Sequence, residues 1–164
     1  MFRLNRLTDY AVVVMSQMAL RGGETRSAQQ ISEDTGVPLP TVAKLLNLLG
    51  RAKLVTSQRG ASGGYILSAE PEAITVAQII QAMEGPIALT ACVDGATDCC
   101  GAEAFCPMRG NWNRVNDAIR GALTSVTLAE MMVVPAFGLP REPVRPAVAR
   151  AAPPDAPAAV AAKQ

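Results

Sequence analysis

Residues 27–67 carry the pattern that most restricts the fold of this chain. Ser27 and Gln30 have the spacing of a capping box, which starts a helix, and Gly36 has the position that ends it. The sequence VPLP then interrupts the helical pattern, and Pro40 suits the first position of a second helix. Two helices joined by so short a turn predict a helix-turn-helix.

The second of these helices is amphipathic. Its apolar residues recur at helical spacing and are expected to face a core: Val42, Leu45, Leu46 and Leu49. The residues on the opposite face are polar or basic: Thr41, Lys44, Asn47 and Arg51. A polar, basic outer face is typical of a recognition helix, which enters the major groove of DNA.

A β-hairpin is predicted directly after this helix. Strand candidates at Leu54–Ser57 and Tyr65–Ser68 flank the loop RGASGG, whose glycines permit a tight turn and a close approach of the backbone to a ligand. A hairpin in this place is a wing. We expect Arg59 to enter a narrow minor groove, and Ser62 with the free N–H groups of the loop to meet phosphates.

Further helix signals lie on both sides of this unit. Thr8 is a candidate N-cap, with Asp9 in the first turn, for a helix that ends at Gly22. Capping boxes predict helices that start after Thr75 and Thr127. A longer helix is predicted from Met108 to about Leu123, with the apolar stripe Trp112, Val115, Ile119 and Leu123.

The composition supports a helical core. Hydrophobic residues make up 49% of the 164 residues but aromatic residues only 4%, so the core must be aliphatic, which suits helices packed on helices. The expected fold is therefore mostly α: a winged helix-turn-helix with a small β-hairpin wing and a long C-terminal helix.

The compartment follows from the N-terminal segment. Ser16 and Gln17 break its apolar run and no cleavage site follows, so it is interpreted as an amphipathic helix rather than a signal peptide. No run approaches the roughly 20 apolar residues that span a bilayer. We expect a cytoplasmic protein without membrane contact, in which thiols stay reduced.

The charge is unevenly distributed. Residues 1–67 carry eight Lys and Arg against four acidic residues, whereas residues 68–134 carry three against eight. A basic N-terminal part joined to an acidic one favours a nucleic-acid-binding module attached to a second function.

All four cysteines lie within residues 92–106, and the chain contains no histidine. In a reducing compartment, clustered cysteines indicate a metal or redox site rather than structural disulfides. The spacing Cys-x6-Cys-Cys-x5-Cys lacks the close pairs of most zinc sites and fits a larger iron–sulfur cluster. Zinc and a thiol/disulfide switch are the alternatives.

These motifs together resemble the Rrf-two family of winged-helix regulators, the group that includes IscR and NsrR, over residues 1–133. The resemblance rests on LTDYAVVVM, KLLNLLGRAKLV, RGASGGYIL, ITVAQIIQAMEG and the spaced cysteines before a Trp-bearing helix. It implies a homodimeric transcriptional repressor that binds operator DNA, dimerises through the helix near 108–123, and responds to cluster status or to redox or nitric-oxide stress. The chain looks most like the branch that regulates the SUF iron–sulfur assembly genes.

The resemblance also implies cluster ligands. They fall on Cys92, on Cys99 or Cys100, and on Cys106, for a [2Fe–2S] or [4Fe–4S] cluster. The family's histidine ligand is absent, since Arg109 stands in its place. The fourth ligand is therefore the second cysteine of the doublet or Asp9 of the partner subunit. Asp9 has a plainer interpretation too, as an anion at a helix N-terminus.

The expected DNA contacts follow from the same pattern. Base edges are assigned to Thr41, Lys44 and Asn47, the wing contacts to Arg59 and Ser62, and phosphates to Arg3, Arg6 and Arg51.

Four segments are expected: a DNA-binding domain at 1–85, a cluster-binding loop at 86–107, dimerisation helices at 108–134 and a disordered Pro/Ala-rich tail at 135–164. The chain has no catalytic constellation, so we expect no enzyme and no electron carrier. A winged helix that binds protein instead of DNA is the third class of function considered.

Overall fold

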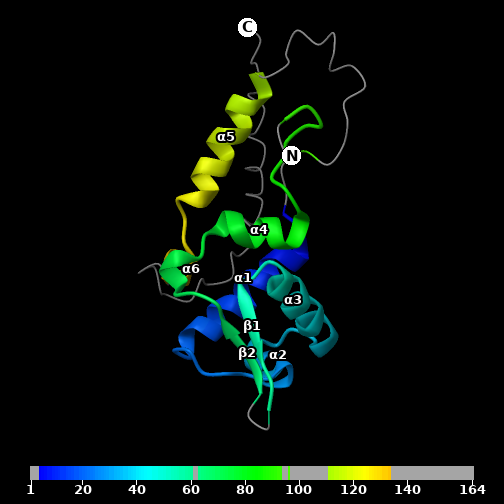
Figure 1. The fold of residues 1–164 in the computed structure, drawn as a ribbon, viewed down its shortest axis with the longest axis vertical. Coiled ribbons are helices and arrows are strands. Elements are labelled where there is room, and N and C mark those ends of the chain that lie inside the picture. Colours follow the sequence, from blue (N-terminus) through cyan, green and yellow to red (C-terminus); the bar gives the residue numbers. More distant parts are fainter. Residues whose placement is uncertain (1–3, 61–62, 94–95, 97–110, 134–164) are drawn as a thin grey trace, which may run out of the picture. The chain divides into compact units, whose positions relative to one another are not determined.

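The computed structural model describes residues 4–60, 63–93, 96 and 111–133. Predictions for Arg3, Ser62, Cys99, Cys100, Cys106, Arg109 and the tail at 135–164 lie outside these residues. The elements follow in the order α1 (Arg6–Leu20), α2 (Ala28–Thr35), α3 (Leu39–Arg51), β1 (Val55–Gln58), β2 (Gly64–Leu67), the 3-10 helix η1 (Pro71–Ala73), α4 (Val76–Glu84), α5 (Asn111–Thr124) and α6 (Leu128–Met132) (Figure 1).

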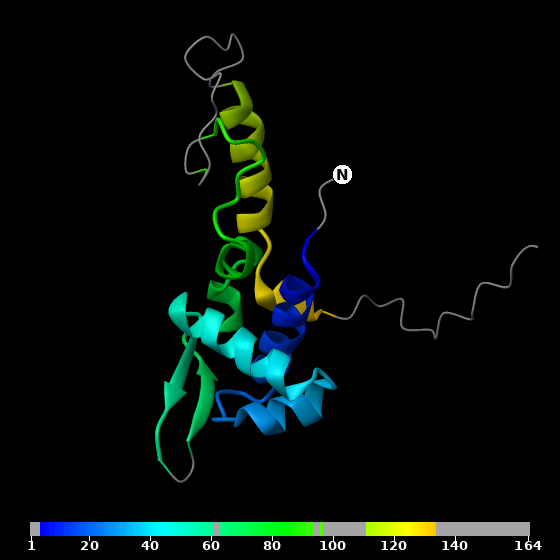
Figure 2. The ribbon, with the colours of Figure 1, turned by 90° about the vertical axis from the view of Figure 1, so that its right-hand side faces the viewer.

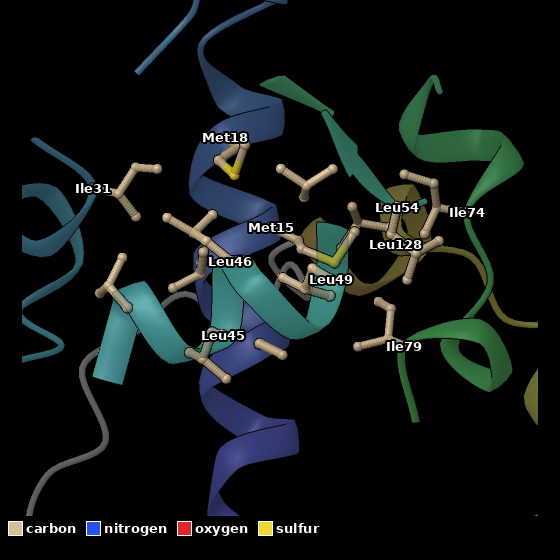
Figure 3. Close-up of a cluster of buried hydrophobic side chains, with 14 of the residues drawn as sticks. Met15, Met18, Ile31, Leu45, Leu46, Leu49, Leu54, Ile74, Ile79 and Leu128 are labelled. Atoms are coloured by element: carbon tan, nitrogen blue, oxygen red, sulfur yellow. The ribbon is translucent and has the colours of Figure 1, made fainter. Parts of the chain in front are cut away.

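The core lies where α1, α2, α3 and α4 meet, and it is aliphatic as expected. The stripe predicted on α3 is buried there, with Leu45 and Leu49 fully inaccessible. Figure 3 shows Leu45 and Leu49 in one cluster with Met15 of α1, Ile79 of α4 and Leu128 of α6. Because the apolar face of α3 is buried, its polar face is turned outward.

The capping signals set most helix boundaries. Ser27 and Gln30 form the predicted capping box at α2, and Gly36 ends that helix with φ 71°. The boxes at Thr75 and Thr127 are also present. Helix α3 begins at Leu39, one residue before the predicted start.

The prediction for the start of α1 was wrong. The N-cap is Asn5, whose side chain accepts a hydrogen bond from the N–H of Leu7. Thr8 lies inside the helix, where it is buried, and its hydroxyl is used as a donor to Glu84 of α4. Sequence reasoning favoured Thr8 because it considered only bonds within the helix.

The hairpin forms as predicted, with each strand shifted by one residue. The strands are antiparallel and pair Val55 with Leu67 and Gln58 with Gly64, and Figure 2 shows the hairpin projecting beyond the helices. A Cβ at Gly64 would lie 2.5 Å from the carbonyl oxygen of Arg26, a residue that also pairs with Tyr65. The close approach made by Gly64 is therefore to the protein's own backbone.

The turn from α3 to β1 is a Schellman motif. The N–H of Lys53 donates to the carbonyl of Gly50, and that of Leu54 to the carbonyl of Leu49. Lys53 takes the left-handed position with φ 59°. This conformation costs a residue with a Cβ about 1–2 kcal/mol.

The last two helices return to the winged helix. Ile119 and Leu123 of α5 pack on the α4 side chains of Val76, Ala77 and Ile80. Leu128 at the start of α6 is fully buried, and its N–H donates to the carbonyl of Ile74 just before α4. Helix α5 is therefore attached at its C-terminal end to the same core that holds α3.

Among the described residues, no helix combines the length and the apolar character needed to cross a bilayer.

Candidate nucleic-acid interface and cysteine site

A cleft of about 750 Å³ lies between α3 and the hairpin. It is lined by Ala43, Leu46, Asn47, Gly50, Arg51, Lys53, Val55, Thr56, Ser57 and Tyr65. One wall is the second half of α3, and the other is formed by β1 and by Tyr65 of β2. We call this hollow the α3–wing cleft.

The cleft and its rim are basic. Residues 39–60 contain Lys44, Arg51, Lys53 and Arg59 and no acidic residue. All four side chains are exposed, and within the described part of the chain none of them takes part in an ion pair. A concave surface with unpaired basic side chains and hydrogen-bonding Asn, Ser and Thr groups suits a polyanion such as the DNA backbone.

The structure brings together some of the predicted DNA contacts. Asn47 and Arg51 both line the α3–wing cleft. Lys44 is exposed one turn before Asn47, and Thr41 is half-buried near the start of the helix; neither lines the cleft.

The remaining described contacts lie on other elements. Arg59 is exposed directly after β1, at the base of the wing loop, and Arg6 is exposed at the first position of α1. Arg3 and Ser62 fall outside the described residues.

Cys92 lies in a turn that follows α4. Its Sγ is 3.2 Å from the hydroxyl oxygen of Thr90, and the adjoining Val93 is buried. The thiol itself is half-buried. A hollow of about 340 Å³ lies against this turn and is lined by Glu84, Gly85, Pro86, Ala88, Leu89, Thr90, Ala91 and Ala96.

A buried amide fixes the chain upstream of Cys92. Asn116 of α5 is 2% exposed; its Nδ2–H donates to the carbonyl of Ile87 at 3.0 Å, and its Oδ1 accepts from the N–H of Leu89 at 3.1 Å. These two bonds use both ends of the amide. The segment that carries Cys92 is therefore held against α5 before it reaches the cysteine.

A carboxylate connects the same region to α1. Oε1 of Glu84, the last residue of α4, accepts hydrogen bonds from the Thr8 hydroxyl at 2.5 Å and from the N–H of Asn5 at 2.8 Å. Asp9, the candidate ligand next to Thr8, is exposed, and its carboxylate has no hydrogen bond or ion pair within the described residues. Glu84 thus orients the turn of α1 that presents Asp9.

The potential ligands among the described residues, Cys92 and Asp9, are of types that bind an iron–sulfur cluster. Cys92 offers a half-buried sulfur, the ligand type that holds such clusters, and Asp9 offers an unpaired oxygen. No group of three Cys, Asp or Glu side chains gathers within the described residues, and the other three cysteines lie outside them.

Three residues that sequence reasoning missed stand out here. Asn116 had a signal, since Asn116, Ile119 and Leu123 recur at spacings of three and four, so the face of α5 that packs on α4 includes an amide. Glu84 and Lys53 had none, because their importance depends on a partner across the fold and on a backbone angle.

Comparison with known proteins agrees with this arrangement. The sequence profile of the Rrf2 family, described as an iron-dependent transcriptional regulator, matches residues 4–133. The HTH-type transcriptional regulator IscR of Photorhabdus laumondii is 34% identical over 131 residues, which cover 79% of each chain.

Two solved structures are similar in fold. CymR of Bacillus subtilis, described as its global cysteine regulator, superposes with a TM-score of 0.60 at 33% identity and covers 80% of this chain and 97% of its own. IscR of T. potens gives 0.57 at 32% identity and covers 80% of this chain and 86% of its own.

These comparisons confirm the winged-helix fold and the resemblance drawn from the sequence motifs. The relatives are transcriptional regulators and not enzymes, as expected for this chain. The protein belongs to the Rrf2 family of DNA-binding transcriptional regulators.

Proposed function

We propose that this protein is a cytoplasmic repressor whose operator affinity depends on an iron–sulfur cluster, and that it controls iron–sulfur assembly genes. The observation that carries the proposal is the attachment of the Cys92 segment to the rest of the fold. Asn116 fixes that segment to α5, and Glu84 connects its start to α1. A change at the cysteines can therefore reach the helices that position α3.

The proposed ligands are Cys92, Cys106 and one or both of Cys99 and Cys100, with Asp9 of a second copy as the alternative fourth ligand. When bound, the cluster supplies iron that responds to oxidants and nitric oxide. The chain's own residues provide thiolates, and Thr90 places a hydroxyl 3.2 Å from the sulfur of Cys92. Asp9 supports a ligand role because its carboxylate is exposed while Thr8 beside it is fixed by Glu84.

The proposal includes a homodimer formed through α5. Ile119 and Leu123 pack inward, but Val115 is 45% exposed and lies beside Ala118 in a shallow hollow on the outer side of the helix. An apolar residue on an outward face of a long helix favours a helix–helix contact with a second copy. Dimerisation would also set the spacing of the two α3 helices on a palindromic operator.

The proposed DNA contacts are Asn47, Lys44 and Thr41 for base edges and Arg51, Arg6 and Arg3 for phosphates, with Arg59 and Ser62 on the wing. The outward, basic face of α3 and its cleft with β1 support this assignment. Asn47 has the strongest support among the base contacts because it lies in the cleft, where its amide can pair with adenine.

Anaerobic purification of the full chain tests the cofactor. We expect a coloured protein with visible charge-transfer absorption and near-equal iron and acid-labile sulfide, both lost in Cys92→Ser. A colourless protein with zinc or with no metal would exclude a cluster.

Thiol chemistry without a cluster is the second candidate. It is favoured by the likeness to CymR, described as a cysteine regulator, and by a solved oxidised form of Staphylococcus aureus CymR at 26% identity. In that case the anaerobic protein would be colourless, and its DNA affinity would change on oxidation with loss of free thiols. This candidate would be excluded if the protein holds a cluster and if its number of free thiols stays unchanged on mild oxidation.

A further inference from the structure

Lys53 has an unusual backbone conformation. Among the described residues it is the one non-glycine residue with positive φ, at 59°. It occupies the C′ position of the Schellman motif that ends α3, where glycine is the usual residue because a Cβ is crowded there. The same chain places glycine at the end of α2, where Gly36 has φ 71°.

The fold itself determines the conformation but does not call for a lysine. Leu49 and Leu54, the residues joined by the outer hydrogen bond of the motif, are both buried in the core. The turn is therefore fixed by packing, and any residue at position 53 must accept the left-handed angle. The Lys53 side chain is exposed and forms no ion pair within the described residues.

The position of Lys53 indicates a different use. It lies in the turn between α3 and β1, and it lines the α3–wing cleft together with Asn47, Arg51 and Thr56. An ammonium on a flexible stem binds phosphate as a point charge. Strained backbone held by surrounding packing is often found at binding sites.

We propose that Lys53 is a dedicated contact to the DNA backbone, where its ammonium binds a phosphate at the mouth of the α3–wing cleft. The charge at this position serves DNA binding, whereas the Cβ that carries it opposes folding, because it is held at the left-handed angle. The proposal rests on the DNA contact assigned to α3 and the wing, and it adds a residue that neither the helical pattern nor the wing loop identifies.

The test compares Lys53→Asn and Lys53→Gly, which accept the left-handed angle without a charge, with Lys53→Arg, which keeps the charge. The probes are a duplex that the wild-type protein selects from a randomised library and a second duplex of unrelated sequence. Affinity is measured as a function of salt, and melting temperature is measured on the same preparations. Asn47→Ala serves as the control for a base contact.

Both neutral variants are expected to bind either duplex about tenfold more weakly per copy at 0.1 M salt, because one phosphate contact contributes a slope of about 0.9 in log affinity against log salt. That slope should become shallower by about one per bound copy, while Lys53→Arg stays near wild type. The melting temperatures of the two neutral variants should equal or exceed the wild-type value. Asn47→Ala should lose affinity for the selected duplex alone.

Unchanged affinity and salt slope in both neutral variants would overturn the proposal. A lower melting temperature in both would overturn it as well, because Lys53 would then serve the fold by placing a positive charge at the end of α3. If Asn47→Ala and the neutral Lys53 variants all bind both duplexes like the wild type, the cleft does not bind DNA. If only the neutral Lys53 variants bind like the wild type, the Lys53 contact alone is wrong.

Discussion

The hydroxyl of Thr8 donates a 2.5 Å hydrogen bond to Oε1 of Glu84, which joins the first turn of α1 to the last residue of α4. The same oxygen accepts the N–H of Asn5. The predicted cluster-binding loop, 86–107, begins two residues after Glu84, and Asp9 directly follows Thr8. One carboxylate therefore joins the turn of α1 that presents Asp9 to the end of α4, from which the chain continues to Cys92.

Removing this carboxylate should weaken the dependence of DNA binding on the cluster. In Glu84→Ala and Thr8→Val, the ratio of operator affinities with and without the cluster should fall toward one. The reason is that α1 is then no longer hydrogen-bonded to the end of α4, so a change in the cysteine segment does not reach it. Thr8→Ser keeps the hydroxyl and should retain the wild-type ratio. Titration of anaerobic protein with operator, before and after cluster removal, measures this ratio.

A purely structural role for the bond would give a different result. Glu84→Ala would then lower the melting temperature and leave the ratio of affinities unchanged.

Replacing Asn116 should destabilise the protein and loosen the Cys92 segment. In Asn116→Leu, the buried carbonyl of Ile87 loses its partner, which costs about 1–3 kcal/mol, and the part-buried N–H of Leu89 loses its partner at a smaller cost. Chemical denaturation of the cluster-free protein measures this change. Asp117→Ala, an exposed neighbour, is the control and should stay within about 0.5 kcal/mol of wild type. Equal stability of the two variants would show that the amide bonds do not hold the segment.

Arg59→Ala should reduce operator affinity about tenfold with no loss of stability, because the exposed guanidinium at the base of the wing has no ion-pair partner within the described residues. Fluorescence anisotropy at moderate salt is a suitable measurement. Arg120→Ala removes an equal charge from the exposed surface of α5 and should bind normally. Equal affinities for the two variants would count against the wing assignment.

Val115→Asp should convert a dimer into a monomer, since a carboxylate would enter the proposed contact between two α5 helices. Light scattering coupled to size exclusion measures the mass, and circular dichroism checks that the helices remain. Asp117→Ala again provides a neutral comparison on the same helix. A wild-type protein that is already monomeric would contradict the dimer.

Sequence patterns predicted the elements of the winged helix well because their signals are local. The capping boxes at Ser27, Thr75 and Thr127 and the stripe that includes Leu45 and Leu49 each act within one helix. The RGASGG motif predicted the hairpin for the same reason.

Long-range relationships were not predictable in this way. Thr8 was assigned to a cap because its partner, Glu84, is 76 residues away. Gly64 was interpreted as leaving room for a ligand, whereas the space is taken by the backbone of Arg26. Asn116 shares the helical spacing of Ile119 and Leu123, but only its partners Ile87 and Leu89 explain why an amide is buried there. Each of these residues is explained only by a neighbour that another element supplies.

Cluster-dependent repression is tested most directly by measuring operator affinity on one anaerobic preparation before and after its cluster is removed, with Cys92→Ser measured alongside. We expect bound iron and sulfide in the wild type, a change in affinity of about fivefold or more on removal of the cluster, and a Cys92→Ser protein that behaves like the cluster-free form throughout. Equal affinities of the loaded and cluster-free wild type, or a preparation without sulfide, would contradict cluster-dependent repression.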